Sequence, residues 1–263
     1  CFTLILPVLM VLLTLLPLQP AFAEESDEVY DAIIKRGELI VGLSADYAPY
    51  EFHADVNGKD TIVGFDVAIA QKIADDLGVD LKIDELGFDA LLGALKTGKI
   101  DLIISGMAPT AERLKEVDFS DPYMDVQQRI IVRKEDKDTF HSTADFEGIK
   151  VGVQKQSTQE ELAKSELTGS VPTSLQKVPD IVNNLKHNKV DAVILEGPVA
   201  EAYVERNDDL VFADVAFKEG EKQTAIAMVK NTPILKEQVN ASIKEIQDKN
   251  LLDGYKKDAA ELM

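Results

Sequence analysis

Apolar residues follow two different spacings along this chain, and together they predict an α/β fold. Short apolar runs such as Leu39 to Leu43 and Leu102 to Ile104 have the pattern of buried parallel strands. Elsewhere apolar residues recur every three or four positions, as between Phe65 and Leu77, which is typical of an amphipathic helix that ends at Gly78. Strands and helices that alternate in this way form a sheet covered by helices.

The same patterns predict the remaining elements. Further strands are expected at 81–83, 127–133, 150–153, 190–195, 210–213 and 224–229. Further helices are expected at 29–36, 88–95, 159–167, 181–185, 198–205, 233–249 and from 255 onward. One more helix is expected to open at Pro109 and Thr110, with Thr110 as its N-cap.

Two parts of the chain resemble each other. Residues 95–105 can be laid over residues 185–195 without a gap, and residues 40–44 match residues 150–154. This repetition predicts two lobes of related α/β topology. We expect residues 24–130 and 226–263 in the first lobe and residues 131–225 in the second.

Four loops are the candidates for a binding site. In open α/β sheets, ligands bind at the carboxyl ends of the strands. The loops that follow predicted strands are residues 44–51, 105–113, 154–159 and 196–198. Two lobes that face each other would bring all four loops into one cleft.

Arg113 carries the clearest chemistry on these loops. It falls in the first turn of the helix that Thr110 is expected to open, where a cation is unfavourable unless an anion lies beside it. A guanidinium next to free backbone N–H groups is a receptor for a carboxylate. The alternative is that Arg113 pairs with Glu112, Glu116 or Asp118 on an exposed face, and these residues alone leave both interpretations open.

The first 23 residues have the composition of a signal peptide. An apolar run from Phe2 to Leu18 precedes the small-residue sequence Ala21-Phe22-Ala23 and the acidic Glu24. We therefore expect an exported protein whose mature chain begins at Glu24, with an uncleaved anchor as the alternative. Cys1 is the only cysteine, so the mature chain is expected to contain no disulfide.

The charge excludes several classes of partner. A formal net charge of -19 argues against binding to nucleic acid or to an anionic membrane surface, and it is compatible with a cationic ligand. His53, His141 and His187 are scattered and have no cysteine nearby, so we expect no metal site. No cofactor is expected either.

Four motifs together resemble a known family. They are Asp-Tyr-Ala-Pro-Tyr-Glu at 46–51, Gly-Phe-Asp at 64–66, Ser-Gly-Met at 105–107 followed by Arg113, and Asp-Phe-Ser-Asp-Pro-Tyr at 118–123. As a set they resemble the extracytoplasmic solute-binding proteins of ABC importers for polar amino acids. The resemblance implies a type II periplasmic-binding-protein fold, in which two hinge-connected lobes close on one amino acid. It also implies a permease as partner, a monomer and no catalysis.

The resemblance also implies roles for single residues. Arg113 is expected to clamp the α-carboxylate of the ligand, assisted by the backbone N–H of Thr158. The carbonyl of Gly106 and the carboxylate of Glu196 are expected to meet the α-ammonium. The other expected ligand-binding residues are Ser44, Asp46, Tyr47, Phe88, Ser105, Ala108, Gln154 and Ser157.

Some of these residues have structural alternatives. Tyr47 and Phe88 resemble the aromatic pair that encloses the ligand side chain, consistent with cation–π contacts. Phe88 also fits the apolar face of its helix, and Tyr47 also fits a side chain that braces the turn at Pro49. Gln154 either lines the side-chain pocket or ends a strand.

Three positions depart from the family pattern and bear on ligand choice. Glu196 replaces the more frequent Asp, Ala108 replaces a Thr or Ser, and Ser44 replaces an Asp that commonly reaches cationic or amide side chains. Asp46 and the acidic composition favour Arg, Lys or His, whereas Ser44 and Gln154 favour Gln or another uncharged polar amino acid. A dehydratase-like enzyme and a ligand sensor on the same fold are the alternative functions.

Overall fold

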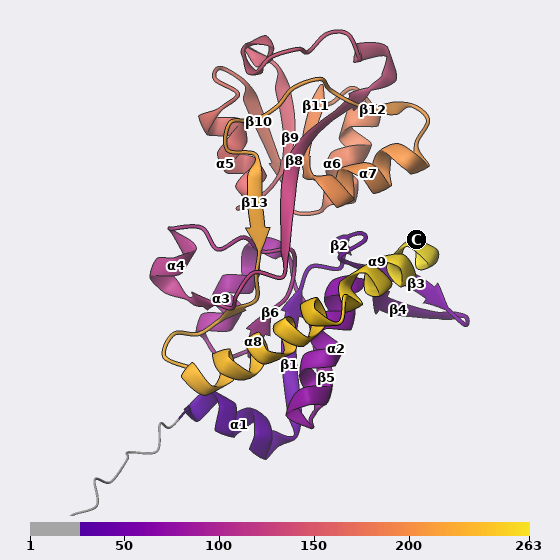
Figure 1. Ribbon diagram of the computed structural model, residues 1–263. Coiled ribbons are helices and arrows are strands. Elements are labelled where there is room, and N and C mark those ends of the chain that lie inside the picture. The colour runs from indigo at the N-terminus through magenta and orange to yellow at the C-terminus, as the bar shows by residue number, and fades with distance from the viewer. Residues whose placement is uncertain (1–26) are drawn as a thin grey trace, which may run out of the picture.

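The computed structural model describes residues 27–263, which form two lobes joined by two strands (Figure 1). A mixed sheet lies at the centre of each lobe. The predicted signal peptide, residues 1–23, lies outside the described residues. Among residues 27–263, no helix is long and apolar enough to cross a lipid bilayer.

The sheet of the first lobe has five strands. β1 is parallel to β5 and to β6, whereas β14 is antiparallel to β6 and to β7. The order across the sheet is β5 (Asp80–Glu85), β1 (Glu38–Leu43), β6 (Leu102–Ile103), β14 (Ala227–Met228) and β7 (Asp118–Phe119). The three strands predicted for residues 39–104 are confirmed.

The sheet of the second lobe has six strands. β9 is parallel to β10 and β11, and β8 is antiparallel to β11 and β12. Its order is β10 (Val171–Leu175), β9 (Lys150–Gln154), β11 (Ala192–Glu196), β8 (Met124–Arg133) and β12 (Leu210–Phe212), with β13 (Glu221–Thr224) paired to β8. β8 and β13 run side by side between the lobes (Figure 1). The prediction of one strand over 224–229 is wrong, because the chain there leaves β8 and pairs with β6 instead.

Most helices lie where the apolar spacing predicts them. They are α1 (Glu28–Arg36), α2 (Phe65–Leu77), α3 (Leu91–Lys96), α4 (Arg113–Glu116), α5 (Thr158–Ser165), α6 (Val178–Lys186), α7 (Gly197–Arg206), α8 (Pro233–Asp248) and α9 (Leu251–Leu262). Short 3-10 helices cover Phe88–Ala90, Lys134–Asp136 and Thr143–Phe146. The prediction that Thr110 caps the next helix is confirmed: its Oγ1 atom accepts from Arg113 N at 3.2 Å and its carbonyl accepts from Leu114 N at 2.9 Å, although the regular helix α4 begins only at Arg113.

A small third sheet was not predicted. It consists of β2 (Asp46–Tyr47), β3 (Glu51–Val56) and β4 (Lys59–Val63), the last two forming a hairpin. Asn57 and Gly58 make the turn with positive φ angles of 56° and 79°. The hairpin brings the chain back beside the start of β3, and α2 begins directly after it.

The repeated sequence forms the same structure in both lobes. A Cβ atom on Gly42 would lie 2.3 Å from the side chain of Ile100, and one on Gly152 would lie 2.6 Å from Ile181. Asp101 accepts a hydrogen bond from Ile40 N at 2.8 Å, and Asp191 accepts the equivalent bond from Lys150 N at 3.2 Å. Each lobe therefore packs side chains closely on its sheet at a glycine and ties two parallel strands with an aspartate.

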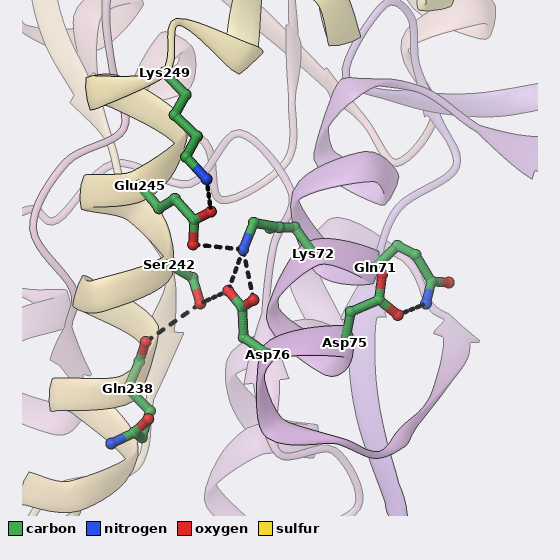
Figure 2. Close-up of polar contacts among 8 residues, drawn as sticks. All are labelled: Gln71, Lys72, Asp75, Asp76, Gln238, Ser242, Glu245 and Lys249. Carbon is green, nitrogen blue, oxygen red and sulfur yellow. Dashed lines mark hydrogen bonds and ion pairs between the residues drawn. The ribbon is translucent and has the colours of Figure 1, made fainter.

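The C-terminal helices belong to the first lobe, where α8 and α9 pack on α2. Figure 2 shows the polar contacts between α2 and α8. Lys72 Nζ lies 2.6 Å from Asp76 Oδ2 and 2.9 Å from Glu245 Oε2, and Ser242 Oγ donates to Asp76 at 2.6 Å. These contacts hold α8, near the C-terminus, on the first lobe, which is formed mainly by the first half of the chain.

Candidate functional site

A small cavity lies between the two lobes. Its volume is about 10 Å³, too little for an amino acid, so binding requires the lobes or the lining side chains to move. Nine of the twelve predicted ligand-binding residues line it. They are Tyr47, Phe88, Gly106, Ala108 and Arg113 from the first lobe and Gln154, Ser157, Thr158 and Glu196 from the second.

These residues meet because parallel strands end at the same edge of each sheet. Gly106 follows β6, Gln154 ends β9 and Glu196 ends β11. The loops after these strands face one another across the cavity. This is the position at which open α/β sheets bind ligands.

Arg113 is buried between the lobes. Only 7% of the residue is exposed, and its guanidinium donates to Ala108 O at 2.9 Å and, across the cleft, to Gln156 O at 2.9 Å. It also lies over the ring of Phe88, 5.5 Å from the centroid. Burial lowers the pKa of Arg113. The alternative of an exposed ion pair for this residue is therefore wrong.

The start of α5 supplies backbone donors from the second lobe. Ser157 caps this helix, because its hydroxyl accepts from Glu160 N at 3.2 Å and donates to Gln154 O at 2.6 Å. The first N–H groups of a helix have no intrahelical partner. The N–H of Thr158 is therefore available to a carboxylate held by Arg113.

Glu196 places a buried acid in the same cavity. The residue is 2% exposed, and its Oε2 atom has no hydrogen-bond partner among residues 27–263. Burial raises the pKa of Glu196 to about 7, whereas the nearby Tyr50 hydroxyl, the Gln128 amide and, to a smaller extent, the charge of Arg113 act to lower it. A buried carboxylate with an unpaired oxygen is favourable only if a cation or a donor comes to it.

The aromatic side chains both line the cavity and pack on the protein. The Tyr47 ring is buried, with its centroid 5.3 Å from that of Tyr50. Phe88 is half-buried and packs against the apolar cluster that contains Leu91 and Leu95. Phe88 therefore packs on the core, as one interpretation held, and also lines the cavity, while its contact with a ligand side chain stays a prediction.

The structure does not bring the other three predicted residues into this cavity. Ser44 and Asp46 line a neighbouring open cleft of about 670 Å³. Asp46 accepts from Ser44 Oγ at 3.1 Å and, across the cleft, from Val178 N at 3.2 Å, and burial raises its pKa to about 6. The hydroxyl of Ser105 points away from the cavity and donates to Glu51.

Comparison with known proteins identifies the family. Residues 39–258 match the family model of bacterial extracellular solute-binding proteins, family 3. The chain belongs to this family. It is 39% identical to the arginine-binding extracellular protein ArtP of Bacillus subtilis, over 84% of this chain and 85% of that protein. It is 30% identical to the L-cystine-binding protein TcyJ of Escherichia coli, over 89% and 86%.

A solved structure of this family has the same fold. The amino acid ABC transporter substrate-binding protein AbpA from Streptococcus pneumoniae, bound to L-arginine, is 42% identical with a TM-score of 0.86, over 88% of this chain and 98% of that one. The predicted two-lobed fold, the predicted family and the predicted role as the solute-binding component of an ABC importer are therefore confirmed.

One residue that lines the cavity was not among the predicted ligand-binding residues. Gln159 lines it, donates to Gln128 Oε1 at 2.8 Å and reaches Tyr47 Oη at 3.5 Å. Gln159 lies on the same face of α5 as the buried Leu162 and Ala163. A polar residue on an apolar helix face is the signal that identifies it.

Proposed function

We propose that this protein captures L-arginine outside the cytoplasm and delivers it to a membrane permease. The observation that carries the proposal is the pair of opposite charges, Arg113 and Glu196, which the two lobes place in one cavity. We propose the division into lobes expected from the sequence, with one change: β8, which begins at Met124, pairs with β11 and so belongs with the second lobe. The protein is proposed to act as a monomer in a periplasm or at a cell surface, without catalysis.

The backbone groups of an amino acid match this cavity. An α-carboxylate suits the guanidinium of Arg113 and the N–H of Thr158, since a fork of donors and a helix N-terminus both favour a carboxylate. An α-ammonium suits the carbonyl of Gly106 and the free oxygen of Glu196. A ligand held in this way would join the lobes by its two charges, which favours the closed state.

The charges around the cavity favour a cationic ligand side chain over glutamine. Asp46, Asp66 and Glu196 are acids whose pKa values are raised, in each case chiefly by burial. Entry of a cation would lower the energy of ionising these groups. The rings of Tyr47 and Phe88 add cation–π attraction, and the two arginine-associated relatives support this choice.

Contacts between the lobes support closure of the cleft as the way in which the ligand is held. Lys155 Nζ lies 2.8 Å from Asp89 Oδ2, and the side chain of Gln176 reaches the same carboxylate at 3.3 Å. On one side of the cavity these contacts close the cleft, and Arg113 bonded to Gln156 O closes it on another. We propose that ligand binding adds to these contacts and shifts the protein toward closure.

A thermal-shift screen of ligand-stripped protein against the twenty amino acids tests the proposal. A ligand at a hundredfold its dissociation constant adds about 2.7 kcal/mol of stability, so L-arginine should give a clear rise in Tm. Arg113→Ala should abolish the rise, and Lys115→Ala, which removes an exposed cation from the same helix, should keep it. A larger rise with L-glutamine would refute the choice of ligand.

Two further outcomes bear on the broader assignment. A screen in which no amino acid raises Tm would refute amino-acid binding altogether. Chromatography of the recovered ligand separates binding from a dehydratase-like activity, because a binding protein returns L-arginine unchanged. Consumption of the ligand would contradict a role without catalysis.

A further inference from the structure

Two buried carboxyl groups contact the residues at which the chain leaves β6 and reaches the cavity. We call residues Ser105 and Gly106 the strand-end corner. Glu51 is the first residue of β3, and Asp66 is the second residue of α2. Both residues are 0% exposed, and neither lines the cavity.

The β3–β4 hairpin brings these two acids together. Phe65 N bonds to Pro49 O at 3.1 Å, and Asp66 N bonds to Tyr50 O at 2.9 Å. Gly64 makes this approach possible, because a Cβ atom there would lie 2.1 Å from Tyr50 O. The chain before β3 and the start of α2 are therefore held side by side.

Each acid holds one residue of the strand-end corner. Glu51 Oε1 accepts the hydroxyl of Ser105, whose Oγ accepts Ser44 N at 3.1 Å. Asp66 Oδ2 accepts Gly106 N at 2.8 Å. These bonds hold the Ser105 side chain and the peptide unit between Ser105 and Gly106, and the position of that unit sets where the Gly106 carbonyl can point.

Close packing leaves the corner no room to adjust. Gly106 has a φ of 53°, and a Cβ atom on it would lie 3.3 Å from the ring of Tyr47 and 3.4 Å from that of Tyr50. A second donor, the hydroxyl of Tyr123, reaches Asp66 Oδ1 at 2.9 Å and Oδ2 at 3.0 Å. Both oxygens of Asp66 therefore accept, which an ionised carboxylate does best.

Within residues 27–263, Glu51 is the member of the pair with a free carboxyl oxygen. Its Oε1 atom accepts from Ser105, but its Oε2 atom has no partner among the described residues. Burial raises the pKa of Glu51 well above its usual range and that of Asp66 to about 7, and the charge of Asp66 raises the pKa of Glu51 further. Two like charges in one buried site cannot both form at neutral pH without a large cost.

The groups around the pair are acids and phenols. Arg113 acts on Glu196 from across the cavity and opposes the rise of its pKa. Five titratable groups lie close enough for their charges and those of the pair to affect one another's pKa values. Asp46 and Tyr47 lie on β2, Tyr50 precedes β3, Tyr123 follows β7, and Glu196 ends β11.

We propose that Glu51 and Asp66 are positioning residues that hold the strand-end corner as a pair with a single negative charge, the proton lying on Glu51. Asp66 accepts the N–H of Gly106 and so aims the Gly106 carbonyl at the α-ammonium of the ligand. The inference rests on the proposed function, which assigns that carbonyl to the ammonium.

Two isosteric variants separate this role from simple space filling. Glu51→Gln reproduces the neutral acid, so its affinity for L-arginine at pH 7, measured by calorimetry, should stay within about twofold of the wild type. Asp66→Asn replaces one accepting oxygen with a donor that faces Gly106 N or Tyr123 Oη, so its affinity should fall at least roughly tenfold. Equal losses in the two variants would overturn the proposal.

A second measurement needs no ligand. The folded state keeps Glu51 protonated, so its stability falls as pH rises above about 4.5, the value in the unfolded chain, toward the raised pKa. From pH 5 to pH 8 the Tm of the wild type should therefore fall more than that of Glu51→Gln. Parallel curves would overturn the proposal, and this comparison decides it alone if Asp66→Asn does not fold. If the wild type binds no amino acid, the proposed function fails while the Tm comparison still tests the pair.

Discussion

Replacing Glu196 by Gln tests how the ligand ammonium is held. Glu196 is 2% exposed, and its free Oε2 faces no partner among residues 27–263. Gln keeps the shape of the side chain and removes the charge. A hydrogen bond to a charged group contributes about 1.5–3 kcal/mol, so Glu196→Gln should weaken L-arginine binding by roughly 10- to 150-fold.

The pH dependence of binding gives a second magnitude. The pKa of Glu196 is about 7 without ligand, and the ammonium of the ligand requires the ionised form. Affinity should therefore be highest above pH 8 and fall by up to roughly tenfold for each pH unit below 7. The stability of the ligand-free protein has the opposite dependence: because the pKa is raised, stability is greatest below about 4.5 and is lost as pH rises toward 7.

Isothermal titration calorimetry with L-arginine from pH 8 to pH 5.5 measures both effects. The wild type should bind roughly 30-fold more weakly at pH 5.5 than at pH 8, and Glu196→Gln should lack that change. Glu201→Gln removes an exposed carboxylate from α7, the helix that follows Glu196, and should behave as the wild type does. A wild-type affinity that does not change with pH, or a Glu196→Gln variant with wild-type affinity, would refute the reasoning.

Three further predictions concern single side chains. Arg113→Lys replaces a fork of donors with a point charge and should raise the Kd for L-arginine at least roughly tenfold in calorimetry, and an unchanged Kd would contradict the clamp. Gly106→Ala, at a φ of 53°, should cost about 1–2 kcal/mol of unfolding free energy in urea, whereas Gly93→Ala, with open space around it in α3, should be neutral or stabilising. Asp27→Ala should cost about 1–2 kcal/mol of unfolding free energy in the same assay, because Asp27 caps α1 by accepting from Tyr30 N and also accepts from Leu235 N. Asp31→Ala, an exposed residue in the same turn, is the control, and an equal loss in that variant would contradict the capping role.

The elements that were predicted correctly are those whose apolar pattern follows from their burial. β1 and α2 have continuous or periodic apolar residues because each is covered by neighbours of its sheet and helix layers. The β3–β4 hairpin was missed because its strands alternate weakly and are partly exposed. Its Asn57-Gly58 turn was a usable signal, since this pair favours the positive φ angles that a tight hairpin needs.

Most of the residues that line the cavity were predicted, because strand ends are visible in the sequence. Nine predicted residues line the cavity, and they lie on the loops that follow β6, β9 and β11 or on the aromatic segments beside them. Ser105 follows the same strand but turns its hydroxyl to Glu51, which no local pattern indicates. Gln159 was missed although its place on an apolar helix face was available as a signal.

The sequence by itself determined most of the buried strands and helices, the repeat between the lobes and the family. Local periodicity records whether each residue is covered, because burial of apolar surface is the main stabilising contribution to folding. Periodicity does not indicate which distant segment of the chain packs against a given residue. Only the tertiary structure places Arg113 opposite Glu196 and sets Glu51 beside Asp66 beneath Gly106, because these contacts depend on how whole elements pack and on where the chain crosses between the lobes.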